Sequence, residues 1–343
     1  MSGPEGPEAP RGRAEDAAAR LLRWYPRAWR SRYGEEFTEL LIADIGERPR
    51  SRSRTADVIR GGIVARLGDA GLCGCAPEAG PRVRASLASL ACCVAVFLGF
   101  GGAMWSQLTI GWQWSEPDTA GVAVATFVTS GAMLAFAVLA VLAGLPVAWS
   151  VASCLARGRP PGGAARGLLG PSVLFLAGLA VVVAGGRHFG NGWPGTGGHA
   201  WAVPGLVPGG VAAFSWASAL SVSSFWAHPA ALAAFPAAEL AWMALSPLAV
   251  ACAVAGAVTV VRRAEFSPRV LDLEARLGAA ACVIMVVFLG GCGAWIADRA
   301  PGPGNLFHAG AIDVAGVVVM TVALAVARQA ARQAARYARV VAP

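Results

Sequence analysis

The sequence contains no lysine and little charge of either sign. All 28 basic residues are arginine, and charged residues make up 14% of the 343. A soluble domain of this length carries about 25% charged residues. Hydrophobic residues instead reach 56%, and the mean hydropathy is +0.57. The shortage of charge excludes a single soluble globular domain and indicates a membrane protein. The arginine-only basic set, with its abundant alanine, glycine and proline, is typical of a GC-rich genome and carries no functional weight.

Signatures of catalysis and ligand binding are missing as well. The sequence has no Gly-x-x-x-x-Gly-Lys phosphate loop, no nucleophile elbow and no His-Glu-x-x-His pair. Cys73 and Cys75 form a Cys-Gly-Cys pair without a second ligand pair, which favours free thiols over a metal or redox site. Five further cysteines lie in apolar runs, where a thiol behaves as a small hydrophobe: Cys92, Cys93, Cys252, Cys282 and Cys292. We therefore expect no enzymatic activity, no cofactor and no bound metal.

Six apolar stretches are long enough to cross a bilayer, which takes about 20 helical residues. They are 86–108, 120–150, 167–186, 237–261, 277–297 and 309–327. Backbone polar groups at that depth must be satisfied within the segment, so these stretches are predicted to be helices rather than strands. The predicted fold class is all-α, a polytopic helical membrane protein. The first stretch begins too far along the chain to be a cleaved leader peptide.

The distribution of arginine predicts the orientation. With the N-terminus inside, the loops after the second and fourth spans and the C-terminal tail are rich in arginine, whereas the opposite side carries only Arg187 and Arg299. Cytoplasmic loops are the ones enriched in basic residues, so both termini are predicted to face the cytoplasm of a cell membrane. Six tryptophans fall near the predicted outer boundary: Trp105, Trp112, Trp114, Trp193, Trp201 and Trp295.

Residues 205–235 are apolar and uncharged, but prolines flank and interrupt them. A seventh full span there would place the arginine-rich tail outside. An interfacial or re-entrant segment on the outer side is therefore favoured over a span.

An internal similarity links the first and fifth spans. Both contain an Ala-Cys step, then Phe-Leu-Gly and a glycine-rich run that ends in tryptophan, at Trp105 and Trp295. A parallel duplication of a helical hairpin would explain the similarity, as repeats do in transporters. Chance similarity between apolar segments built from few residue types is the favoured explanation. Under either explanation, the small residues allow helix backbones to approach closely.

The N-terminal quarter of the chain is a different kind of sequence. Residues 1–84 carry 15 of the 28 basic and 12 of the 20 acidic residues. We expect a disordered terminus over 1–13, a cytoplasmic helical module and linker over 14–84, the transmembrane domain over 85–327 and a basic tail over 328–343.

Three short helices are predicted in this module. The first covers 14–24 and stops before Pro26, and the second runs from there until Gly46 and Pro49 end it. Thr55 is expected to cap the third, after a basic linker. The apolar stripe of the second helix is Trp29, Tyr33, Phe37, Leu40, Leu41 and Ile45, and that of the third is Val58, Ile59, Ile63, Val64 and Leu67.

A dense motif opens the second helix, and its residues are Tyr25, Pro26, Arg27, Trp29, Arg30, Arg32, Tyr33, Gly34 and Glu36. The motif resembles the Tyr-Pro-Arg-x-Trp-Arg-x-Arg-Tyr-Gly-x-Glu signature found in actinobacterial multi-pass membrane proteins of unknown function. It is also similar to prefix modules of some ABC-type permeases. The resemblance covers about residues 18–68 and implies a short cytoplasmic module before transmembrane segments, with no attached activity. The chain lacks the large extracytoplasmic domain that prefixed permeases insert after the first span.

Ionisable residues within the membrane part are few. The four histidines, His188, His199, His228 and His308, are expected outside in spacings that match no metal site. Glu239 and Asp313 lie in apolar runs, where ionisable groups mark function by default. Both fall near the outer end of their spans, which favours a helix-end acid or a structural ion pair over a transport residue.

The C-terminal tail repeats arginine at helical spacing, in Arg328, Arg332, Arg336 and Arg339. Near an anionic inner leaflet each contributes about 1 kcal/mol of attraction, so the predicted partner of this face is lipid rather than nucleic acid. The predicted function is a non-enzymatic membrane protein whose module binds a cytoplasmic partner or couples to signalling. Homo-oligomerisation stays open, and a small transporter or permease-like subunit is the alternative.

Overall fold

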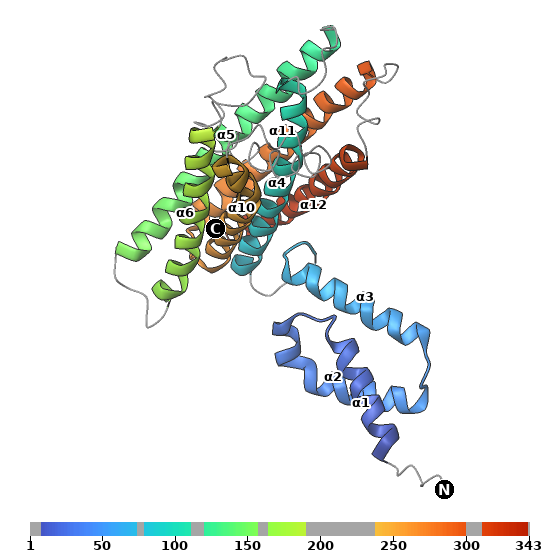
Figure 1. The fold of residues 1–343 in the computed structure, drawn as a ribbon. Helices are drawn as coiled ribbons and strands as arrows, with labels where there is room; N and C mark the ends of the chain where they lie inside the picture. Colours follow the sequence, from blue (N-terminus) through green and yellow to red (C-terminus); the bar gives the residue numbers. More distant parts are fainter. Residues whose placement is uncertain are drawn as a thin grey trace. The chain divides into compact units, whose positions relative to one another are not determined.

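The computed structural model describes residues 8–73, 79–110, 120–156, 164–189, 237–299 and 311–341, and all elements in these ranges are helices (Figure 1). The chain divides into two compact units, Met1–Pro77 and Glu78–Pro343. The predicted all-α polytopic fold is confirmed. The segment 205–235, Cys75, and the histidines 199, 228 and 308 lie outside the described residues.

The first unit contains α1 (Glu8–Leu22), α2 (Arg27–Glu47) and α3 (Arg52–Asp69). Helix α1 takes in residues 8–13, which the sequence placed in a disordered terminus. Pro26 occupies the N-cap position of α2 with φ −58° and ψ 154°, the extended conformation that ends one helix and precedes the next.

The start of α3 differs from the prediction. Ser51, not Thr55, is the N-cap: its hydroxyl accepts a hydrogen bond from the Arg54 backbone N–H at 3.2 Å. The Thr55 hydroxyl donates instead to the Ser51 carbonyl at 3.2 Å. Arg52 and Arg54 therefore belong to the helix rather than to a basic linker.

The core of this unit uses only part of the predicted stripes. Tyr25, Leu41, Ile45 and Val58 are buried together with two alanines of α1. Leu40 is 67% exposed and Val64 52%, so assigning them to the packed faces was wrong. The reason is that α3 packs through glycine: a Cβ at Gly62 would lie 2.9 Å from the Trp24 carbonyl carbon. Ile63, Val64 and Leu67 of α3 are consequently exposed, whereas Val58 stays in the core.

The second unit contains six long helices: α4 (Ala79–Ile110), α5 (Ala120–Ala156), α6 (Ala164–Phe189), α10 (Ala237–Arg263), α11 (Pro268–Arg299) and α12 (Ala311–Val341). Each includes a stretch long and apolar enough to cross a membrane, so the predicted six spans are confirmed for the described residues. The first and fifth stretches begin earlier than predicted, at Ala79 and Pro268, and the sixth ends later, at Val340. These helices continue unbroken through their arginine-bearing ends.

The most extensive packing joins α4 to α12, α6 to α10 and α5 to α11 (Figure 1). Helix α4 also contacts α10 and α11, which places it at the centre of the bundle. At the α4–α11 crossing the rings of Phe97 and Phe288 meet edge to face, 5.6 Å between centroids, and both residues are 0% exposed.

The hairpins α4–α5 and α11–α12 pack in partly matching ways, although α11 and α12 pack on each other more than α4 and α5 do, and α4 also packs extensively on α10. When α4 is matched with α11 and α5 with α12, the contact of α4 with α12 corresponds to the contact of α11 with α5. A Cβ at Gly316 would lie 3.6 Å from Phe100, and one at Gly291 would lie 3.5 Å from the Ala125 carbonyl oxygen. Gly291 follows Phe100 in the sequence by as many residues as Gly316 follows Ala125 and Phe288 follows Phe97. The contacts therefore join matching positions of the two hairpins. This partly matching packing is what a duplicated hairpin would give.

Candidate functional site

The motif of the N-terminal unit divides into a buried and an exposed part. In the buried part, Tyr25 stacks on Trp29 with ring centroids 4.0 Å apart, and Phe37 meets each of them at 5.4 Å. Gly34 is buried against the end of α1, where an added Cβ would lie 3.6 Å from Leu22. The aromatic and glycine positions of the motif therefore build the module.

Burial raises the pKa of the Tyr25 hydroxyl above its ordinary value of 10.0, because a phenolate would lose solvation inside the cluster. The folded unit holds that proton more tightly than the unfolded chain, so its stability is complete below pH 10 and falls as the pH rises above it. We expect the difference in tyrosinate absorbance between wild type and Tyr25→Phe to titrate above pH 10.0. Titration of that difference at or below pH 10.0 would contradict the buried position of the ring.

The exposed part of the motif lies along one face of α2. Arg32, Tyr33, Glu36 and Leu40 follow each other at helical spacing, and all four are exposed. The Tyr33 ring rests against Trp29 at 5.4 Å between centroids, and the Arg32 guanidinium lies 5.3 Å from the Tyr33 centroid. The Tyr33 side chain on this face is therefore fixed by its contact with Trp29, which packs on the core. Arg27 is also exposed, at the start of α2.

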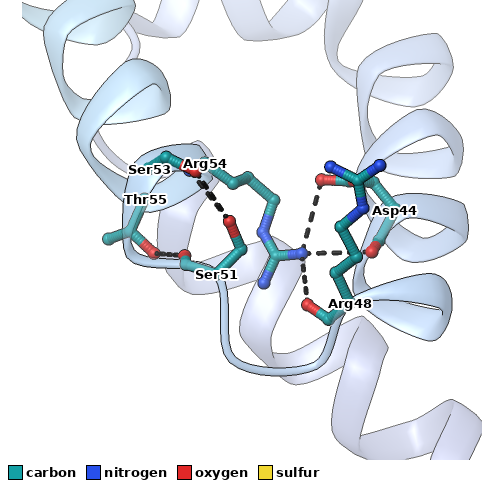
Figure 2. A network of polar contacts seen from close by, with 6 residues as sticks. All are labelled: Asp44, Arg48, Ser51, Ser53, Arg54 and Thr55. Carbon is teal, nitrogen blue, oxygen red and sulfur yellow. Dashed lines mark hydrogen bonds and ion pairs between the residues drawn. The ribbon is translucent and has the colours of Figure 1, made fainter.

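Two arginines of α3 bind the C-terminal ends of neighbouring helices. Figure 2 shows Arg54 reaching from α3 to the end of α2, where its Nη1 donates to the carbonyls of Asp44 at 3.1 Å and Arg48 at 2.9 Å. The same nitrogen lies 3.3 Å from Asp44 Oδ2. Arg66 likewise donates to the carbonyls of Trp24 and Arg23, at 2.6 and 2.8 Å. Cations suit helix C-termini, whose last carbonyls lack partners. Arg66 lies 42 residues along the chain from Trp24, so no local sequence pattern marks this contact.

The arginines of the predicted tail continue helix α12 instead of forming a separate segment. Arg328, Arg332, Arg336 and Arg339 are all exposed on one face. The opposite face is alanine, almost fully buried: Ala327, Ala330, Ala331, Ala334 and Ala338 are each at most 6% exposed. Alanine on this side allows α12 to pack closely on α4 up to its end.

One end of the bundle gathers the arginines of several helices. Arg84 of α4 donates from Nη1 to the Ala264 carbonyl at 3.2 Å, just after α10. Arg263 donates to the Gly167 carbonyl of α6 at 2.9 Å. Pro171 cannot supply the N–H that this carbonyl would otherwise receive within the helix, so the arginine replaces it. Arg84 and Arg263 thus form hydrogen bonds between helices, whereas the arginines of α12 are exposed.

The remaining predicted polar residues lie near helix ends, and their side chains are outside the described part of the structure. Glu239 and Asp313 lie in the first turns of α10 and α12, and His188 lies near the end of α6. Among the residues that the structure describes, no three histidine, cysteine or acidic side chains are grouped so that they could hold a metal. The exposed face of α2 and the arginine face of α12 are the two candidate sites.

No family model matches the chain, and neither does a curated protein or a solved structure. The resemblance of the α2 motif to prefix modules therefore stays a prediction.

Proposed function

We propose that this integral membrane protein is non-enzymatic and binds a protein partner at the cytoplasmic side through the α2 face of its N-terminal unit. The observation that carries the proposal is the division of the motif. Tyr25, Trp29 and Gly34 build the fold, whereas Arg32, Tyr33 and Glu36 are exposed although they belong to the same motif. Tyrosine and arginine are enriched at the centres of protein interfaces, and a ring already fixed by its neighbours loses little entropy on binding.

The orientation in this proposal follows from the arginine-rich end of the bundle. Basic residues flanking transmembrane helices stay in the cytoplasm. Helix α4 begins at this end, and the N-terminal unit precedes it, so the unit is assigned to the cytoplasm. Reporter fusions after residues 160 and 268 are expected to report cytoplasm, and an external signal from the C-terminus would contradict the assignment.

The partner proposal is tested by site-specific photo-crosslinking in native membranes. A photoreactive residue at Leu40 of the full-length protein is expected to yield one adduct of defined mass. Tyr33→Ser is expected to weaken that adduct by at least about tenfold, the usual effect of losing an interface anchor. The matched control places the probe at Leu67 on the exposed side of α3. Equal adducts from both probes, or an adduct insensitive to Tyr33→Ser, would reject the α2 face as the binding surface.

A second function, a small transporter or permease-like subunit, is favoured by the partly matching packing of α4–α5 and α11–α12. Repeated hairpins around a shared centre are common in transporters. Substrate flux in liposomes by the purified protein, without any partner, would favour this function over the first.

A further inference from the structure

We propose that the arginine face of α12 is a binding surface for anionic phospholipid headgroups. The proposal concerns the bundle and does not rest on the partner of the N-terminal unit. Its first support is the fixed position of the face. Ala330, Ala334 and Ala338 are at most 1% exposed, and they hold the last turns of α12 against its neighbours. The arginines are thus part of a rigid helix, not of a loose tail that could move into water.

The arginine face lies in line with the lipid-facing side of the same helix. Val318 and Val322 are more than half exposed, and at 100° per residue they project from the same side as Arg332 and Arg336. Moving along this side, valine changes to arginine at position 328. The valine part of this side therefore faces the lipid acyl chains, and the arginine part that follows it faces the lipid headgroups.

The uncharged segment of α12 is shorter than the hydrocarbon core, which places the backbone of the first arginine below the membrane boundary. Between Asp313 and Arg328, α12 has an uncharged segment about 21 Å long, whereas the hydrocarbon core is about 30 Å thick. The antiparallel contact of α12 with α4 gives the same result. From Gly101, which lies beside Met320, Arg84 is about 25 Å away along α4, whereas Arg328 is only about 12 Å away along α12. Arg328 is therefore deeper than Arg84, and its guanidinium must extend towards the headgroups to keep its charge solvated.

The charge of the face selects the partner. Within the described part of the chain, none of the four arginines forms an ion pair with a carboxylate, and Arg339 bonds only to the Ala335 carbonyl at 3.3 Å. The permanent positive charge of each guanidinium attracts the headgroups of anionic lipids. A second copy of α12 packed on this face would bring arginine against arginine, so charge favours lipid over self-association.

The test uses the delipidated full-length protein in detergent, titrated with phosphatidylglycerol and separately with phosphatidylcholine of the same chains. Native mass spectrometry counts the bound lipids. We expect the wild type to prefer phosphatidylglycerol by at least about tenfold, and R328Q/R332Q/R336Q/R339Q to reduce the preference to about twofold or less. The lysine variant R328K/R332K/R336K/R339K is expected to keep most of the preference, which separates loss of charge from loss of fold.

The matched control is R48Q/R50Q/R52Q/R60Q, which removes the same charge from exposed positions of the N-terminal unit. This variant is expected to bind lipid as the wild type does. The proposal is overturned if the control loses as much preference as the glutamine variant, if the glutamine variant keeps its preference, or if the lysine variant loses it. A dimer that requires the four arginines and shows no lipid preference would assign the face to a second copy instead.

Discussion

Gly256→Ala is expected to destabilise the bundle by about 2 kcal/mol or more, a large loss for one methyl group. A Cβ at Gly256 would lie 2.6 Å from both the Phe175 backbone nitrogen and the Pro171 carbonyl oxygen of α6. Both obstacles are backbone, so no side-chain rotation can relieve them and α10 must move away from α6. Separation also lengthens the bond from Arg263 to the Gly167 carbonyl, leaving that carbonyl without a donor inside a membrane helix.

The matched control is Gly131→Ala in α5, where an added Cβ meets nothing within 4 Å. Alanine is the better helix former by about 1 kcal/mol, so this variant is expected to be neutral or slightly more stable. Thermal unfolding in detergent, followed by circular dichroism, compares the two proteins. Equal midpoints for both variants would contradict the close approach of α6 and α10.

The membrane part of the fold was predictable because its signal is composition over about 20 residues. Each span has few charges and no alternative to helix, so hydropathy alone finds all six. The ends were harder. The last span appeared to stop before Arg328 because a charge normally marks the boundary, whereas the structure continues α12 to Val341. Alanine packing on α4 sustains the helix there, and a hydropathy window does not contain that contact.

The N-terminal unit shows a different limit. Its helix boundaries were visible in Pro26 and in the Gly46–Pro49 stretch, since these residues act locally. Which side of α3 packs was not predictable. The larger apolar residues of α3 suggested the core, but Gly62 allows closer contact with the Trp24 backbone than any side chain would. A helix face that packs through glycine has no periodic row of apolar side chains, so hydrophobic periodicity does not predict it.

Arginine shows why the candidate sites were only partly predictable. Spacing alone predicted the face of α12, because four arginines at helical intervals must share one side. The same residue type in Arg54, Arg66 and Arg263 instead completes the ends or the interrupted ladders of neighbouring helices. The difference depends on which carbonyl lies within reach, and only the tertiary structure supplies that. Exposed arginines in a regular row therefore indicate a binding surface, whereas arginines whose guanidinium groups reach the carbonyls of another helix stabilise the end or the interrupted turn of that helix.

Phe288→Ala is expected to destabilise the bundle by about 3 kcal/mol, the lower end of the range for a buried phenylalanine. Phe288 is 0% exposed and fills the space beside Gly101, where its Cε1 lies 3.1 Å from the position of an added Cβ. In a bilayer, the Phe288 ring of the wild type stays in apolar surroundings when the helices separate. The free energy of transfer out of water therefore contributes little to the expected loss. The loss comes mainly from the contacts and the cavity left at the centre of the bundle. Thermal unfolding in detergent measures it, and Val283→Ala, at a side chain 64% exposed on α11, is the control expected to change little.

Phe97 extends this prediction to the relation between the two hairpins. Because Phe97 is equally buried and packs against Phe288 on α11, Phe97→Ala is expected to cost about as much as Phe288→Ala. The double variant should cost less than the two losses added together, by about 1 kcal/mol, since the ring–ring contact is counted in both single variants. Strict additivity would show that the rings do not touch in the folded protein. A loss confined to one ring would show that α4 and α11 are not equivalent at the centre, and would remove the support that the repeat gives to a transport function.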